Sequence, residues 1–318
     1  MQFDNSIFTT PDRETTINRQ PLVIAPETTL ADAIAKMSQI KGRNCNLISE
    51  SLDEPTIKSS SCALVMSEGK IQGIITERDI VKLTAKAIAF SSVTVSEVMT
   101  TDVVTLQEAN FRDIFAALFL FRRYQIRHLP LVDEDNNLIG MISSESIRLA
   151  MRPANLLKLR KVADVMNSNV VTADIEDTVL ELAQLMATKR VSCLIIVQEE
   201  STEQILIPVG IVTERDILQF QYLQLNIAQI KAKEVMSSPL LLLSPEDSLL
   251  TAHQEMLRKR IRRLVVSWNW GKGLGIVTQT SLLKIFDPME MYGVIESLQN
   301  TVQQLELENQ KLREKMPD

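Results

Sequence analysis

The stretch Gly73-Ile-Ile-Thr-Glu-Arg-Asp-Ile80 returns, with one conservative change, as Gly210-Ile-Val-Thr-Glu-Arg-Asp-Ile217. Two shorter versions, Gly140-Met-Ile-Ser143 and Gly275-Ile-Val-Thr278, keep the same phase. The hydroxyl residues of the four copies are 67, 70 and 65 residues apart. Self-similarity at a nearly fixed period is the signature of a repeated structural unit. The chain therefore contains four copies of one unit.

A second marker supports the same division. A Val-Met pair follows an acidic residue at Val98-Met99, Val165-Met166 and Val235-Met236, with spacings of 67 and 70 residues. Because both markers keep their phase along the chain, the repeats can be placed from the two together.

Hydrophobic periodicity gives the order of elements within one unit. In the third repeat a β-rich run at 170–172 precedes a helical pattern from Val179, and apolar runs at 193–197 and 209–212 follow. A second helix then begins at Arg215. The unit is β-α-β-β-α, and one face of so small a sheet has to be covered by another unit. We predict an α/β (α+β) fold with units stacked in pairs.

These marks resemble the cystathionine β-synthase (CBS) domain family. The run Arg127-His-Leu-Pro-Leu-Val-Asp133 is also usual for it. The resemblance covers residues 20–286 and implies four CBS repeats in two pseudo-twofold pairs, called Bateman modules. The boundaries that we predict are a flexible N-terminal arm (1–19), CBS repeats at 20–90, 94–152, 160–222 and 231–286, and a C-terminal coiled-coil helix (288–318).

The composition excludes several classes of protein. Of 318 residues, 45% are hydrophobic and 23% are charged, as in ordinary globular proteins. The densest apolar stretch, 114–121, is far shorter than the ~20 residues that span a bilayer, and no secretory signal is found, so we expect a cytoplasmic protein. The net charge of −6 offers no field for nucleic acid. The three cysteines lack metal-site spacing and are expected to be buried thiols.

Resemblance to the CBS family implies an adenosine-containing ligand in the cleft between paired repeats. In the family a carboxylate accepts hydrogen bonds from the ribose hydroxyls, while hydroxyl and cationic side chains hold phosphate. Thr76 with Asp79, and Thr213 with Asp216, have the matching spacing at strand-to-helix junctions. Repeats 2 and 4 lack the aspartate and are expected to bind weakly or not at all. They carry Ser143 with Ser146, and Thr278 with Ser281.

The basic side chains have the opposite distribution. Repeat 2 carries Arg127 and His128, and repeat 4 carries Arg262 and Arg263, where repeats 1 and 3 have small residues. In the family the phosphate-facing arm of one site comes from the partner repeat, so each Thr-x-x-Asp junction would be completed within its own pair. This predicts two nucleotide sites per chain. Adenine would rest on the partner's first strand, near Val103 in one site and Leu240 in the other.

Simpler interpretations of these residues stay open. A Thr-x-x-Asp sequence is also a good helix N-cap. His128 could support packing of the following strand instead of contacting phosphate. Arg78 and Arg215 could touch either phosphate or an acidic neighbour.

A heptad pattern follows the fourth repeat, with Ile295, Val302, Asn309 and Met316 at a and Leu298, Leu305 and Leu312 at d. This pattern favours a parallel two-stranded coil, so we expect a homodimer through the CBS pairs and the coil. The alternative is an amphipathic helix that folds back on its own domain. Residues 287–295 resemble the linker after Bateman modules in cyanobacterial-type signalling proteins, which implies a downstream PAS, histidine-kinase or diguanylate-cyclase domain.

No catalytic constellation is found in the sequence, which has two histidines and no glycine-rich phosphate loop. We therefore predict a regulatory module and not an enzyme. It needs no cofactor, senses AMP, ADP or ATP, and passes the signal through the coiled coil to an effector. The alternative is a structural dimerisation scaffold whose clefts stay empty.

Overall fold

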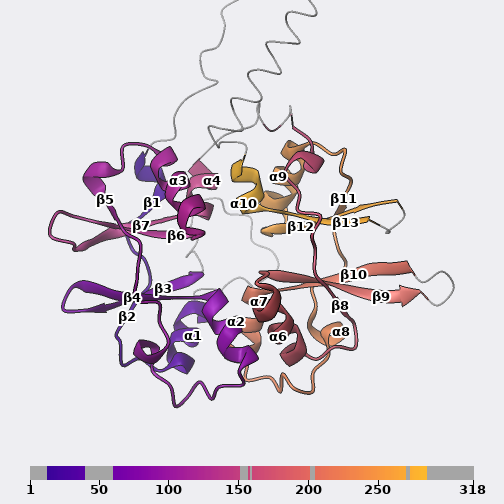
Figure 1. Ribbon diagram of the computed structural model, residues 1–318, viewed down its shortest axis with the longest axis horizontal. Helices are drawn as coiled ribbons and strands as arrows, with labels where there is room; N and C mark the ends of the chain where they lie inside the picture. The colour runs from indigo at the N-terminus through magenta and orange to yellow at the C-terminus, as the bar shows by residue number, and fades with distance from the viewer. Residues whose placement is uncertain are drawn as a thin grey trace, which may run out of the picture.

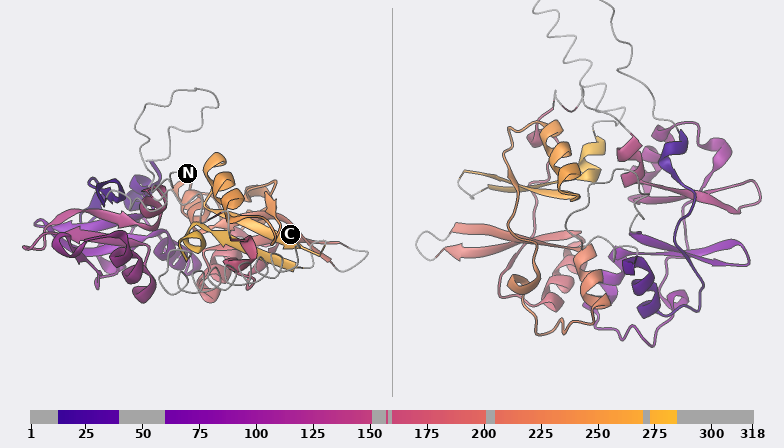
Figure 2. Two further views of the ribbon diagram at one scale, coloured as in Figure 1. Left: turned by 90° about the horizontal axis from the view of Figure 1, so that it is seen from above. Right: turned by 180° about the vertical axis from the view of Figure 1, so that it is seen from behind.

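The computed structural model describes residues 13–39, 60–150, 157, 160–200, 205–269 and 273–284. Four β-α units surround a common centre (Figure 1), and together they form a flattened body when seen from above (Figure 2). The predicted coiled coil at 288–318 lies outside the described residues, as do residues 1–12.

The predicted β-α-β-β-α order is confirmed in each of the four units. Repeat 1 contains β2 (Val23–Ile24), α1 (Leu30–Gln39), β3 (Cys62–Ser67), β4 (Lys70–Thr76) and α2 (Glu77–Ala85). Repeat 2 contains β5 (Leu106–Gln107), η4 (Glu108–Asn110), α3 (Ile114–Tyr124), β6 (His128–Val132), β7 (Leu138–Ser143) and α4 (Ser144–Ala150).

The second half of the chain repeats this order. Repeat 3 contains β8 (Thr172–Asp174), α6 (Val179–Lys189), β9 (Cys193–Glu200), β10 (Ile205–Thr213) and α7 (Glu214–Tyr222). Repeat 4 contains β11 (Leu242–Leu243), α9 (Leu249–Arg258), β12 (Arg263–Trp268), β13 (Gly273–Thr278) and α10 (Gln279–Leu283). A short helical segment precedes each repeat: η2 (Arg13–Thr16), η3 (Val95–Glu97), η5 (Val162–Asp164) and α8 (Ala232–Val235).

The first helices of the repeats begin where polar side chains satisfy their free N–H groups. The Asp113 carboxylate accepts from the N–H groups of Phe115 (2.9 Å) and Ala116 (3.2 Å) at the start of α3. At the start of α6, the Glu181 N–H donates to Thr178 Oγ1 (3.3 Å) and the Thr178 N–H donates to the Glu181 carboxylate (2.7 Å). This reciprocal pair is a capping box.

The sheets follow one topology. In each repeat the first strand pairs in parallel with the second, and the second pairs antiparallel with the third. β8 begins two residues after the start of the β-rich run at 170–172. The two sheets of a pair face each other across apolar side chains: Leu64 and Met141 meet in the first pair, and Ile195, Val197 and Val265 meet in the second.

The expectation of a flexible arm over residues 1–19 is wrong for residues 13–18. Strand β1 (Ile17–Asn18) pairs antiparallel with β7 of repeat 2, with Ile17 opposite Ile142. The Ile17 side chain is buried in the core of that repeat, and Arg13 forms an ion pair with Glu108 at 3.3 Å. Apolar burial and sheet pairing therefore hold this segment on the neighbouring repeat.

The two sequence markers prove to be contact partners within a pair. Met99, which precedes repeat 2, lies over Gly73 of repeat 1, so a Cβ at Gly73 would overlap the Met99 side chain and the Thr100 carbonyl oxygen. Met236, which precedes repeat 4, lies over Gly210 of repeat 3 in the same way. The glycines are needed because another segment crosses their Cα atoms closely. At Gly140 the crossing segment is Ile17 and Asn18, which take the place of the missing first Val-Met pair.

The two pairs meet through helices within the one chain. α2 packs against α6 and α7, and α4 packs against α10. Val81 of α2 belongs to the core of repeat 3, while Leu218 of α7 belongs to the core of repeat 1. These helix faces therefore join the two pairs of one chain. The homodimer expected through the CBS pairs and the coiled coil stays a prediction. Within the described part of the chain, no helix is long and apolar enough to cross a membrane.

Candidate functional site

The Thr-x-x-Asp residues lie together at two strand-to-helix junctions. Thr76 ends β4, and its Oγ1 donates to the Asp79 carboxylate at 2.7 Å. The Thr76 N–H donates to the same oxygen at 3.1 Å. Thr213 and Asp216 repeat both bonds, at 2.7 Å and 2.8 Å. Each aspartate thus caps its helix and remains only partly buried, and the second Asp79 oxygen pairs with Lys82 Nζ at 3.3 Å.

Repeats 2 and 4 build the same junction without a carboxylate. In repeat 2 the Ser143 N–H donates to Ser146 Oγ at 2.9 Å, and the Ser146 N–H donates to Ser143 Oγ at 3.0 Å. Thr278 and Ser281 exchange similar bonds at 3.3 Å and 3.1 Å. A hydroxyl is therefore sufficient to start the helix. The aspartates at the other two junctions offer a charge that capping does not require.

A cavity of about 320 Å³ lies at the cleft between repeats 1 and 2 and extends to the centre of the molecule. The structure brings seven of the predicted site residues to its lining: Thr76, Asp79, Val103, Arg127, His128, Arg262 and Arg263. The first five belong to the predicted site of the first pair, whereas Arg262 and Arg263 were assigned to the second. The arms of both pairs therefore reach one cavity.

The remaining predicted residues lie elsewhere. Thr213, Asp216 and Leu240 do not line this cavity. Leu240 packs beside the apolar cluster that joins the two sheets of the second pair. The predicted first site is thus gathered around a cavity, and the predicted second site is divided between that cavity and the opposite junction.

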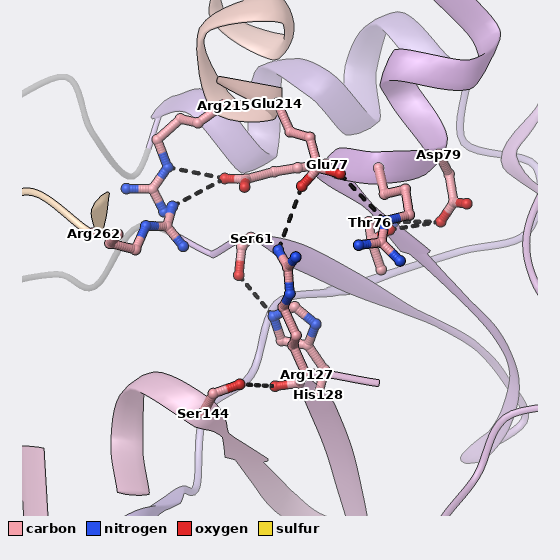
Figure 3. A network of polar contacts seen from close by, with 11 residues as sticks. Ser61, Thr76, Glu77, Asp79, Arg127, His128, Ser144, Glu214, Arg215 and Arg262 are labelled. Carbon is pink, nitrogen blue, oxygen red and sulfur yellow. Dashed lines mark hydrogen bonds and ion pairs between the residues drawn. The ribbon is translucent and has the colours of Figure 1, made fainter. Parts of the chain in front are cut away.

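The arginine arms have partners that the sequence did not reveal. Arg127 Nη1 lies 3.4 Å from the Glu214 carboxylate of repeat 3, and Arg262 Nη2 lies 3.3 Å from the Glu77 carboxylate of repeat 1. Each arm therefore pairs with a glutamate of the other half of the chain, as Figure 3 shows. The glutamate side chains are only 9% (Glu77) and 3% (Glu214) exposed.

The structure gives both Arg78 and Arg215 an acidic neighbour. Arg78 Nε lies 3.2 Å from Glu214, and Arg215 Nε lies 2.9 Å from Glu77. Each glutamate is thus held by two arginines. We call the six side chains the central charge cluster: Glu77, Glu214, Arg78, Arg127, Arg215 and Arg262.

His128 lines the cavity beside this cluster. Its Nε2 lies 2.7 Å from the Oγ of Ser61, which directly precedes β3 of repeat 1. Burial lowers the pKa of His128 to about 4, the nearby Glu77 carboxylate opposes that change, and Arg127 adds to it. The imidazole is therefore neutral at neutral pH and offers a hydrogen bond to the cavity instead of a charge.

Glu77 and Glu214 are the residues that sequence reasoning missed. They precede Arg78 and Arg215 in the two Thr-Glu-Arg-Asp runs, and exact recurrence of that four-residue run was the available signal. Two identical runs that face each other across a pseudo-twofold axis allow each glutamate to meet the other run's arginine. That pairing required knowledge of how the two pairs stack.

The thiols take no part in the cavity lining. Burial raises the pKa of Cys62 to about 12 and raises that of Cys193 as well, so both remain protonated at neutral pH. Cys45 lies outside the described residues. Among the residues that the structure describes, no group of three or more His, Cys, Asp or Glu side chains could hold a metal ion.

Comparison with known proteins places the chain in a family. The model of the CBS domain matches residues 15–86, 95–153, 162–222 and 232–287, which together are most of the chain. The chain belongs to the CBS-domain family and carries four of these domains in tandem. This confirms the family that the sequence marks resemble.

Relatives share parts of this arrangement. An uncharacterized 33.4 kDa protein in a ribosomal RNA operon of Thermofilum pendens is 31% identical over 173 residues, which are 48% of this chain and 53% of that protein. Inosine-5′-monophosphate dehydrogenase of Methanocaldococcus jannaschii is 34% identical over 125 residues, 39% of this chain but 22% of the enzyme. The chain therefore spans about half or less of the length of these curated relatives.

A solved structure shows the whole fold. Protein MJ1225 from Methanocaldococcus jannaschii, described as a putative archaeal homolog of g-AMPK, has a TM-score of 0.68 and 22% identity. The match covers 86% of this chain and 98% of that one. The arrangement of four CBS domains around a centre is thus found in a second protein.

Proposed function

We propose that this chain is a regulatory module that binds an adenosine-containing ligand in the cleft between repeats 1 and 2. One observation carries the proposal: the cavity combines the Asp79 carboxylate, the apolar Val103 and the cationic Arg127. These are the three chemistries that a ribose, an adenine ring and a phosphate need. The binding residues are Thr76, Asp79, Val103, Arg127 and His128.

A second site belongs to the proposal, although its arginines line the first cavity while its Thr-x-x-Asp junction lies elsewhere. Thr213 and Asp216 repeat the geometry of the first junction, and Arg262 and Arg263 are the matching arms. Leu240 takes the place of Val103 beside the sheets. Adenine nucleotides of the AMP, ADP and ATP class are the proposed ligands, and no further cofactor is needed.

The proposed output is conformational. A ligand shifts a protein between two states only by binding one of them more tightly. Ligand in the cleft would change how the two pairs meet at α2 and α7, and a C-terminal parallel coil at 288–318 would carry this change to an effector. Turnover of the nucleotide is not part of the proposal, and the molecule acts in the cytoplasm.

Thermal unfolding with AMP, ADP, ATP, cyclic di-AMP and S-adenosylmethionine tests the proposal. A ligand at 100 times its Kd stabilises the folded state by roughly 2.7 kcal/mol, which gives a clear rise in Tm. The Asp79→Ala variant should lose the contribution of the first site. Asp216→Ala should lose that of the second, and calorimetry should count two ligands per wild-type chain.

Asp32→Ala is the matched control. Asp32 accepts from Thr29 Oγ1 at 2.8 Å at the start of α1, which is the same Thr-x-x-Asp cap, but it does not line the cavity. It should lower the Tm of the free protein and leave the ligand-induced rise unchanged. If no compound raises the wild-type Tm, or if Asp79→Ala keeps the full rise, the proposal is wrong and an empty scaffold is favoured.

A further inference from the structure

The cavity at the first cleft is not a basic pocket. Its lining contains five carboxylates and four guanidinium groups, while His128 is uncharged at neutral pH. The four arginines are Arg78, Arg127, Arg262 and Arg263. The formal charge of the lining is therefore −1, although the arginine arms by themselves would suggest a strong anion site.

Two of these carboxylates compensate the arginines directly. Glu214 lies 3.2 Å from Arg78 and 3.4 Å from Arg127, and Glu77 lies 3.3 Å from Arg262. Because both glutamates are almost fully buried, water screens them little and their charge acts at close to full strength on anything inside the cavity. Any phosphate that reaches these arginines meets a carboxylate at the same place.

The fold does not require acidic residues at these positions. Glu77 and Glu214 are the first residues of α2 and α7, and their N–H groups donate to Ser61 O and Ser192 O at 3.1 Å. The equivalent N–H groups of Ser144 and Gln279 donate at the same distance of 3.1 Å. A buried ion pair also adds little stability over apolar side chains of similar size. Neither backbone geometry nor stability therefore accounts for the two carboxylates.

We infer that Glu77 and Glu214 set the charge of the accepted ligand, so that the cavity selects adenosine compounds with at most one phosphate against di- and triphosphates. This inference rests on the proposed function and adds the ligand class to it. One phosphate can be matched by Arg263, whose Nε has no hydrogen-bond partner among the described residues, and by one shared arm. Each further phosphate brings negative charge against two buried carboxylates and is disfavoured.

The test compares ligands that differ in charge but share adenosine. Neutral 5′-methylthioadenosine, cationic S-adenosylmethionine, AMP and ATP are titrated by calorimetry, with a chelator present so that no divalent cation changes the charge of ATP. The wild type should bind AMP more tightly than ATP. In the Glu77→Gln, Glu214→Gln double variant, affinity for ATP relative to AMP should rise by about tenfold or more.

The neutral and cationic ligands make the test specific for charge. Affinity for 5′-methylthioadenosine should stay within about twofold, and affinity for S-adenosylmethionine should fall, since a buried negative charge has been removed. Glutamine keeps the size of the side chain and an acceptor oxygen for the arginines. The single variants should each give part of the change, which keeps the test valid if the double variant is poorly folded.

The matched control removes two carboxylates outside the cavity that also pair with cations, one exposed and one partly buried. Glu176 lies 2.6 Å from Lys231, Glu255 lies 2.6 Å from Arg258, and neither glutamate lines the cavity. Glu176→Gln with Glu255→Gln should leave the ATP-to-AMP ratio unchanged. The inference is wrong if the wild type binds ATP as tightly as AMP, or if the cavity variants change all four affinities equally. Absence of binding for every ligand would instead overturn the proposed function.

Discussion

The interface between repeats 1 and 3 and the interface between repeats 2 and 4 use one backbone with different chemistry. In repeats 1 and 3 the second helix begins with a glutamate, whereas in repeats 2 and 4 it begins with Ser144 or Gln279. The glutamates of the first interface are the acidic members of the central charge cluster, which pair with Arg78 and Arg215 of the same two repeats and with Arg127 and Arg262 of repeats 2 and 4. At the second, the Gln279 amide oxygen, turned toward Arg148, accepts from its Nη2 (3.2 Å) and Nε (3.3 Å).

This difference shows that repeats with the same fold can supply different functional side chains. The odd repeats supply carboxylates, the even repeats supply the arginine arms, and the two meet because the pairs stack with repeat 1 against repeat 3. Since all four junctions keep the same N–H to carbonyl bond of 3.1 Å, the side chains can differ without changing the fold. The chemistry of the site is therefore largely independent of the scaffold that positions it.

The largest expected effect comes from a substitution that disrupts the charged interface. Glu77→Ala leaves Arg215 and Arg262 without their carboxylate, and removal of one partner of a buried ion pair costs about 3 kcal/mol or more. The free energy of unfolding from urea denaturation measures this loss. A cost below about 1 kcal/mol would mean that the cluster is hydrated and that the two interfaces are alike.

Arg148 is the counterpart at the other interface. It is 6% exposed, and the structure gives it no ion pair within the described ranges. Arg148→Met should therefore lower the free energy of unfolding by less than about 1 kcal/mol or raise it, because a buried charge without an ion pair is replaced by an apolar chain of similar length. A loss as large as that of Glu77→Ala would contradict the distinction between the interfaces.

A pH titration tests the state of His128, which lies beside the charged interface. Its folded pKa of about 4 is below the ordinary histidine value of 6.5, so the unfolded chain binds a proton first as pH falls. The stabilising contribution is complete above pH 6.5 and is lost as pH falls from about 6.5 to about 4. The expected loss is about 3 kcal/mol.

The measurement is urea denaturation at a series of pH values for the wild type and for His128→Gln. Glutamine cannot be protonated, so the difference between the two proteins should shrink as the pH is lowered through this window. If the difference in the free energy of unfolding did not change with pH, His128 would have the same pKa in the folded and the unfolded chain. The folded protein would then not keep the imidazole in the cavity neutral.

The smallest expected effect concerns the caps. Asp79→Ser copies the junction of repeat 4, where Thr278 is followed by Ser281, and should change the free energy of unfolding by less than about 0.5 kcal/mol, while Asp79→Ala should cost about 1 kcal/mol. Both variants should lose ligand binding at the first site equally. Equal stability losses would show that the Asp79 carboxylate is structural, and that the odd and even junctions differ more than their hydrogen bonds indicate.

The fold could be predicted from the sequence because the residues that mark each repeat are residues in close contact. Gly73 and Met99 recur in phase since each glycine is crossed by the Val-Met segment of the adjoining repeat. The same reasoning missed β1 because Ile17 and Asn18 carry no Val-Met marker, although Gly140 needed a covering segment as the other glycines do.

The sequence predicted the part of the candidate site that lies within one pair, but not the contacts between the two pairs. Resemblance to the CBS family implies which residues share a cleft, so Asp79 and Arg127 could be placed around one cavity. It does not indicate how the two pairs stack. The contact of Arg127 with Glu214 depends on that stacking, which is determined by packing between helices of different pairs.

The exchange of segments within each pair has a consequence for how such chains can arise by gene duplication. Strand β1 lies before repeat 1 in the sequence but completes the sheet of repeat 2, and the segment at Lys161 and Asn167, before repeat 3, bonds to repeat 4. A gene fragment that encodes a single repeat would also encode the segment that pairs with the neighbouring repeat. It would lack the segment that pairs with its own sheet. A fragment that encodes two successive repeats includes both halves of the exchange. Duplication of a fragment that encodes a whole pair therefore preserves a product that can fold. One such duplication gives a chain of four repeats.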